Sequence, residues 1–260
     1  NPIYGTNTSR SGLLVPYPQF GGVSASEPIG YSWYHSLQVS TEKRFSRGFT
    51  LQMSYTWAKT MEATRFLNGS DPMPYESLSS YDRTHRLVVS GLWELPFGRG
   101  KHFGGNMPKA MNVLAGGWQL NGMMQRQGGP PLEWGDVWTL FTGNPDDVRL
   151  SKNKRSVDRW FNTEAGFNRN SAQQLGSSIR VSPMRFSGLR ADGQARWDLS
   201  AFKTFSILEQ LKMQFRVEAV NAWNHPNLSS PNTSPTSSSF GTITSQDGTR
   251  AWIMSLKLTF

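Results

Sequence analysis

The sequence of 260 residues contains no cysteine. Disulfides, thiolate metal sites and cysteine nucleophiles are therefore excluded. Long apolar runs are also absent, because none approaches the roughly 18 to 20 consecutive apolar residues that a membrane-spanning helix requires. The first ten residues lack a basic stretch followed by an apolar core, so no secretion signal is recognised within them. Helical membrane proteins are thus excluded, and the apolar residues must serve another architecture.

Motifs for catalysis or metal binding are missing as well. The four histidines show no i, i+4 pairing, which leaves a zinc site unsupported. Asp146 and Asp147 could bind Ca²⁺ in a loop, but the EF-hand spacing is incomplete, and solvated loop carboxylates are the favoured interpretation. Neither a G-x-S-x-G elbow nor a phosphate-binding loop is present. We therefore expect no enzymatic activity, no cofactor and no metal site.

Acidic residues are few relative to basic ones: 27 Lys and Arg face 18 Asp and Glu, for a formal charge of +9. Such an excess raises the possibility of nucleic-acid binding. The basic residues are scattered singly, however, and many fall on the polar faces of predicted strands. Solvated or lumen-facing positions are favoured, and no nucleic-acid partner is expected.

Alternation of apolar and polar residues is the dominant pattern. The hydrophobic share is only 37% and the mean hydropathy −0.50, but aromatic residues reach 12%. In LKMQFRVEA, residues 211–219, apolar side chains alternate with Lys, Gln, Arg and Glu. Because side chains alternate across a strand with period two, each such run predicts a strand with one apolar face. The predicted strands are 31–45, 49–60, 84–95, 117–128, 196–206, 211–219 and 250–260.

The strands of a soluble antiparallel sheet can also alternate apolar and polar residues. Three features favour a membrane barrel over such a sheet. Each strand has about ten residues, as a tilted strand crossing a bilayer requires. Aromatic residues collect near strand ends, as in interfacial girdles. Charged residues on the polar face suit a water-filled lumen. The predicted fold is all-β, an antiparallel transmembrane β-barrel in contact with outer-membrane lipid. The predicted lipid-facing residues are Leu51, Met53, Leu211, Met213, Phe215 and Val217.

The lengths of the links between strands predict the orientation. Links 46–48 and 207–210 are short, and the long links fall at the opposite ends of the strands, as with short periplasmic turns and long external loops. Link 97–116 is an exception on the short side, which we interpret as an insertion. The predicted external loops are 62–82, 129–195 and 220–249.

Strand parity leaves two alternatives open. With seven strands and a periplasmic final residue, the first residues fall outside the cell, whereas a complete single-chain barrel has an even number of strands. Either an eighth strand lies near Gly12 to Val15, or the chain is the C-terminal part of a larger barrel. We interpret 1–30 as an external loop or partial strand, and 31–260 as the C-terminal part of a barrel with about seven or eight strands.

The external region 129–195 is rich in rings. Exposed rings on long loops can stack on sugars or on a partner. The alternative, which the sequence favours, is that the rings pack the loop onto its neighbours. The candidate recognition residues are Trp134, Trp138, Trp160 and Phe161.

Five segments resemble one family along most of the chain and in the same order. They are YPQF (17–20), LQVSTEKRFSRGFTLQMSYTWAKTM (37–61), DRTHRLVVSGLWELPFGRGKHF (82–103), WDLSAFKTF (197–205) and FRVEAVNAWNHPN (215–227). Together they resemble the C-terminal half of the barrel in Oar-like TonB-dependent outer-membrane receptors, a type abundant in acidobacteria.

The resemblance implies a 22-stranded barrel with an N-terminal plug, often preceded by a carboxypeptidase-regulatory-like domain. The plug and the TonB box would lie upstream of Asn1, so coupling to the TonB complex would use parts outside this chain. The implied function is uptake or passage of an unidentified solute, with surface recognition, in the Gram-negative outer membrane. Two alternatives stay open: a self-contained eight-stranded barrel with a structural or adhesive role, and a soluble all-β carbohydrate-binding domain.

The terminal run RAWIMSLKLTF, residues 250–260, has an apolar residue at every second position. Barrels that this chain resembles commonly end on Phe, and the barrel assembly machinery reads their terminal strand. An aromatic ring also suits a membrane interface physically. The residues expected to form this C-terminal assembly signal are Trp252, Met254, Leu256, Leu258 and Phe260.

Overall fold

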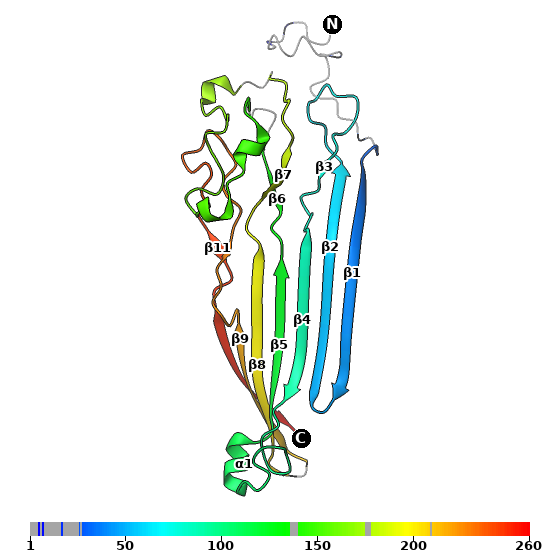
Figure 1. The fold of residues 1–260 in the computed structure, drawn as a ribbon, viewed down its shortest axis with the longest axis vertical. Helices are drawn as coiled ribbons and strands as arrows, with labels where there is room; N and C mark the ends of the chain where they lie inside the picture. Colours follow the sequence, from blue (N-terminus) through cyan, green and yellow to red (C-terminus); the bar gives the residue numbers. More distant parts are fainter. Residues whose placement is uncertain are drawn as a thin grey trace.

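One antiparallel sheet dominates the computed structural model, which describes residues 5, 7, 17, 26, 28–135, 140–174, 178–208 and 210–260. Its long strands pair in sequential order, each beside the next (Figure 1). They are β1 (Tyr31–Ser46), β2 (Phe49–Ala63), β4 (His85–Glu94), β5 (Trp118–Gln127), β8 (Gln194–Ser206), β9 (Lys212–Val220) and β12 (Ala251–Thr259). All seven predicted strands are confirmed. The possible strand near Gly12 to Val15 lies outside the described residues.

The register of the sheet brings the apolar residues of successive strands onto one face. Residues paired directly across antiparallel strands point to the same side. Met53 pairs with Val89, Val89 with Met124, and Met124 with Trp197. We call this side the apolar face. Its large apolar members are Tyr31, Trp33, Leu37, Val39, Phe49, Leu51, Met53, Tyr55, Trp57, Met61, Leu87, Val89, Trp93, Trp118, Leu120, Met124, Trp197, Leu199, Phe205, Met213, Phe215, Val217, Trp252, Met254, Leu256 and Leu258.

Charged residues occur on the apolar face only near the strand ends. Lys59 and Arg126 lie toward one end of their strands. Lys43 and Lys203 lie toward the other. Between these two groups, the seven described strands carry no charged side chain on this face, so the apolar face contains a charge-free band.

The opposite face of the sheet is polar. Arg196 and Asp198 form an ion pair there with an Nε–Oδ2 distance of 2.9 Å, and Gln119 donates to Glu94 Oε1 at 3.1 Å. A few apolar side chains interrupt this face, among them Val88, as the blurred alternation of that strand predicted. We call this side the polar face.

The links between strands separate by length, as predicted. One end of the sheet carries the two-residue turn Arg47–Gly48, the link 207–211, and the link containing α1 (Lys109–Ala115). The long links gather at the opposite end, which we call the loop end (Figure 1). Their short elements are β3 (Ser77–Leu78), β6 (Pro131–Glu133), η2 (Pro145–Val148), η3 (Lys152–Lys154), η4 (Ser171–Gln173), β7 (Arg185–Arg190), β10 (Asn227–Leu228) and β11 (Gln246–Asp247).

Two details differ from the sequence prediction. Leu211 lies just before β9, in a turn where its carbonyl oxygen accepts the backbone N–H groups of Ile207 and Leu208. It is therefore not a strand residue of the apolar face. The strands β1 and β2 have 16 and 15 residues, more than the roughly 9 to 11 that cross a bilayer, so they extend beyond it. Within the described residues, no helix is both long and apolar enough to cross a membrane.

The β1–β2 hairpin provides a test of the backbone geometry. Both turn residues have positive φ, 53° at Arg47 and 77° at Gly48, as a type I′ turn requires. We expect Gly48→Ala to lower the free energy of unfolding by about 1 to 2 kcal/mol, because a Cβ is strained in this conformation. Arg47→Asn should be neutral or slightly stabilising, since Asn tolerates it. Urea unfolding in lipid vesicles, followed by tryptophan fluorescence, measures both variants. An unchanged midpoint for Gly48→Ala would contradict this turn geometry.

Candidate functional site at the loop end

The two longest links fold together into one packed cluster at the loop end. Trp134 lies edge-on to Phe161 with ring centroids 4.9 Å apart, and Phe161 packs against Phe240 at 5.2 Å. Backbone hydrogen bonds from Trp160 N to the Gly241 carbonyl and from Ile243 N to the Val157 carbonyl join the same two links. We call this cluster the loop core. It consists of Leu132, Trp134, Phe141, Val148, Trp160, Phe161, Phe167, Phe186, Leu189, Ala191 and Phe240.

The loop core decides the role of the predicted recognition rings. Trp134, Trp160 and Phe161 are only 1%, 8% and 0% exposed. The expectation that these three rings stack on a sugar or a partner is therefore wrong, because they are already covered by the loops themselves. The alternative interpretation, that they pack the loop, is the correct one for them. Trp138 lies outside the described residues.

A buried arginine ties the loop core to the sheet. Arg185, on β7, has a side chain only 3% exposed and pairs with Glu62 of β2 at 2.9 Å. It also pairs with Glu133 of β6 and donates to the Leu78 carbonyl of β3 at 2.5 Å. Arg65, which follows β2, pairs with the same Glu133. We call these contacts the Arg185 network, and they link four separate segments of the chain.

The Arg185 network controls the ionisation of Glu133. Partial burial alone would raise the pKa of this carboxyl. Hydrogen bonds from Arg65 and Arg185, together with their positive charges, outweigh that effect and hold the pKa below its usual value. Glu133 therefore stays ionised, and the positive charge of Arg185 is compensated although it is buried.

A second ion pair fixes the segment that precedes β4. Arg190 lies 2.5 Å from Asp82, whose side chain is fully buried. Asp82 also accepts the backbone N–H of Thr60 at 2.6 Å. The two charged partners are 108 residues apart in the sequence. Sequence analysis missed both this pair and the Arg185 network, because no local spacing or motif connects residues that far apart.

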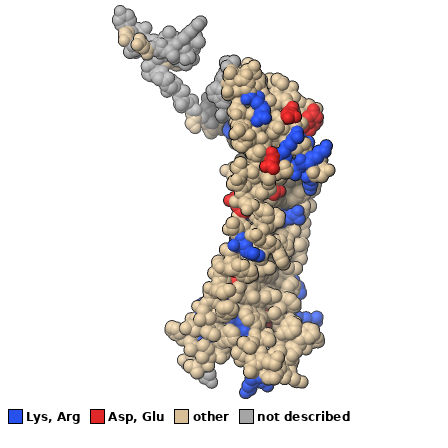
Figure 2. Space-filling view, turned by 90° about the vertical axis from the view of Figure 1, so that its left-hand side faces the viewer, with Lys and Arg blue, Asp and Glu red and all other residues tan. Residues whose placement is uncertain are grey.

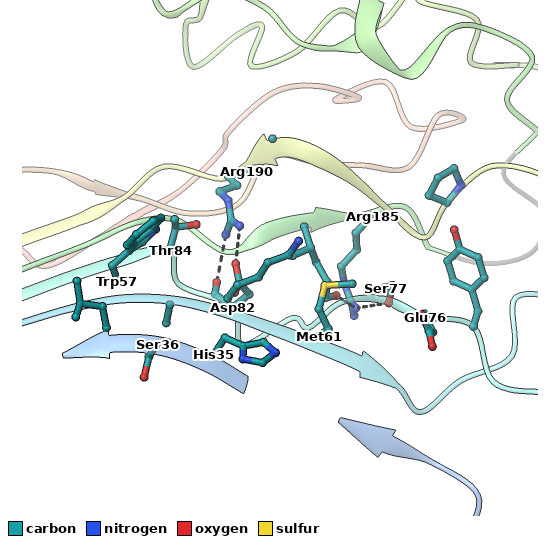
Figure 3. Close-up of a pocket in the computed structure, with 17 residues that line it drawn as sticks. His35, Ser36, Trp57, Met61, Glu76, Ser77, Asp82, Thr84, Arg185 and Arg190 are labelled. Carbon is teal, nitrogen blue, oxygen red and sulfur yellow. Dashed lines mark hydrogen bonds and ion pairs between the residues drawn. The ribbon is translucent and has the colours of Figure 1, made fainter. Parts of the chain in front are cut away.

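An open cavity of about 870 Å³ lies between β1, β2 and β7 beside these ion pairs (Figure 3). Arg185 and Arg190 reach its wall already paired. The dashed lines in Figure 3 mark the contacts of Arg190 with Asp82 and the hydrogen bonds that Arg185 donates to Ser77 and to the Leu78 carbonyl. The exposed ring of Trp57 also lines the cavity, as do His35 and Lys59. The lining can stack on a flat group and form hydrogen bonds with a polar one. Among the described residues, no three His, Asp or Glu side chains lie close enough together to hold a metal ion.

The other predicted site residues lie on the apolar face. Leu51 and Met53 are in β2, whereas Met213, Phe215 and Val217 are in β9. The four strand residues of the predicted assembly signal line the same face of β12. Phe260 follows directly after β12 and is almost fully exposed. Their roles in lipid contact and in assembly remain predictions.

A family model described as an outer membrane beta barrel domain matches residues 1–252. The chain belongs to this family. The match agrees with the antiparallel sheet, and it confirms the predicted barrel fold and the predicted location of this outer membrane barrel protein. It gives no support to a soluble carbohydrate-binding domain. No curated protein and no solved structure matches the chain.

The Arg185 network provides a test of how the loops of the barrel protein are held. We expect Arg185→Gln to destabilise the loop core by about 3 kcal/mol, because it leaves Glu62 and Glu133 without their buried partner. Arg65→Gln is the matched control. Its side chain is half exposed, so its loss should cost less than about 1 kcal/mol. The measurement is the rate of limited proteolysis within residues 140–174. Equal rates for the two variants would contradict an anchoring role for Arg185.

Proposed function

We propose that this chain forms part of the wall of an Oar-like, TonB-dependent outer-membrane receptor through which an unidentified solute passes. One observation carries the proposal: seven strands in register present a charge-free apolar band on one side and charged, polar side chains on the other. In a barrel wall the first side contacts lipid, and the second faces a water-filled interior. The loop end then faces outward, and the short links face the periplasm.

The open edges of the sheet support a barrel with additional strands. Among the described strands, β1 and β12 each pair on one side only. In hydrocarbon, every unpaired backbone group costs several kcal/mol, so a membrane barrel has no open edge. β1 and β12 are the two ends of the strand order, and the sheet does not close between them (Figure 1). Closure of the barrel therefore requires pairing partners for both edges.

The folded loop end supports recognition of a solute before it passes. The loop core and the two ion-pair systems hold the long links as a fixed layer. Such a preformed outer surface favours tight binding, because ordering loops on binding would reduce the affinity. Coupling to the TonB complex would use a plug and a TonB box outside this chain.

Arginine substitutions on neighbouring residues of β2 test the two faces of the wall. Met53 lies on the apolar face and pairs with Thr41 and Val89. Gln52 lies on the polar face and pairs with Glu42. We expect Met53→Arg to impair folding into lipid vesicles by roughly 2 to 4 kcal/mol, because its charge would sit within the bilayer. Gln52→Arg should fold normally, since water and Glu42 accommodate the charge.

The folded yield is measured from heat-modifiable migration on gels, with equal amounts of purified protein. Equal yields for the two variants would contradict the lipid contact of the apolar face. A larger loss for Gln52→Arg would reverse the assignment of the two faces.

Energy-coupled uptake is tested in cells without knowing the solute. Depletion of small molecules from the growth medium is compared among the wild type, a deletion of this gene and a deletion of tonB. We expect the same solutes to remain in the medium of both deletion strains, and a plasmid copy of the gene to restore their uptake. Solutes retained only by the gene deletion would indicate passive passage and would contradict TonB dependence.

A further inference from the structure

The link between β4 and β5 is the longest link at its end of the sheet. Residues 96–117 contain no Asp or Glu, but they include Arg99, Lys101 and Lys109. Figure 2 shows the same bias, because the charged side chains visible at this end are basic. We call residues 97–116 the α1 segment. Lys101 lies 3.6 Å from Glu94 of β4, but the segment itself carries only positive charges, which complement an anionic surface.

The α1 segment exposes apolar side chains beside these charges. In α1, Met111 and Leu114 are 56% and 76% exposed, and no residue of the helix is buried. Phe97 and Phe103 stack with ring centroids 5.3 Å apart, and both are about half exposed. A seven-residue helix is too short to be stable alone in water. Exposed rings, exposed Met and Leu, and neighbouring basic residues are typical of segments that lie at a membrane surface.

Two residues of the apolar face hold α1 beside the membrane-spanning strands. Lys203, in β8, donates from Nζ to the carbonyl oxygens of Asn112 and Val113 at 3.0 and 2.6 Å. Trp118, in β5, donates from Nε1 to the Leu114 carbonyl at 2.8 Å. Lys203 and Trp118 are paired across β8 and β5, and both side chains point to the apolar face. The C-terminal end of α1 is therefore attached on the lipid side of the wall.

We propose that the α1 segment is a membrane-surface anchor that inserts Met111 and Leu114 into the periplasmic leaflet and binds anionic phospholipid through its basic residues. The proposal rests on the lipid contact of the apolar face described above. Because Lys203 and Trp118 bind its main chain, the α1 segment lies directly beside the apolar face. Each basic residue near an anionic surface adds to the attraction, and the exposed apolar side chains add burial in the acyl boundary.

Fluorescent labels measure whether residue 114 lies in lipid. The chain has no cysteine, so a cysteine introduced into it, in a protein without other cysteines, can be labelled selectively with the NBD fluorophore. The variants are Leu114→Cys, Leu256→Cys as a reference on the apolar face, and Thr236→Cys as an exposed loop-end reference. Each is reconstituted in nanodiscs, whose two faces are open to solution. Dithionite, which stays in water, then reduces the accessible label.

We expect the label at 114 to be reduced slowly, like the label at 256, and the label at 236 to be reduced quickly. Replacing Lys101 and Lys109 together by Gln should speed the reduction at 114 several-fold in nanodiscs that contain phosphatidylglycerol. The same replacement should have little effect in pure phosphatidylcholine.

The two references separate the possible failures. Fast reduction at 114 with slow reduction at 256 overturns the anchor but not the lipid contact of the apolar face. This result is expected if the α1 segment instead faces a periplasmic partner. Fast reduction at both positions overturns the proposed lipid contact itself. Slow reduction at 114 with no effect of phosphatidylglycerol overturns the binding of anionic lipid.

Discussion

The strand register is the constraint on which the rest of this protein depends. Because side chains alternate with period two, a shift of one residue in any strand would move its apolar set to the polar face. The observed pairing keeps Met53, Val89, Met124 and Trp197 together across four strands without such a shift. In the first pair, the register shifts between Lys43 and Ser46, beside the tight turn, and is then continuous as far as the pairing of Tyr31 with Ala63. Separation of an apolar side from a polar side follows from this register.

Local patterns in the sequence predicted the wall of the barrel but not its ends. Strands such as β9 were predictable because each carries its own alternation, LKMQFRVEA, within nine residues. The loop core was not predictable in this way, since the abundance of rings in 129–195 does not tell whether the rings are exposed or buried. Trp134 and Phe161 are buried because links distant in the sequence cover them. Arg185 and Glu62, 123 residues apart, have no local signal either.

Charged side chains make different kinds of contact at the two ends of the sheet. At the loop end, the buried Arg185 requires carboxylate partners, and Glu62 and Glu133 supply them. At the opposite end, Lys203 has no carboxylate contact among the described residues, and instead donates to main-chain oxygens of α1. Lys203, on the apolar face, thus attaches the link 97–116 to β8. Sequence analysis had interpreted this link only as an insertion.

Nitroxide scanning of β2 tests most directly whether the sheet separates lipid from water. Single spin labels placed from Leu51 to Thr56 in the reconstituted protein report collisions with oxygen, which is concentrated in lipid, and with a water-soluble nickel chelate. The expected result is a period of two, with oxygen contact at Leu51, Met53 and Tyr55 and nickel contact at the residues between them. Accessibility to nickel on both faces, or an alternation of opposite phase, would contradict a barrel wall with this apolar face toward lipid.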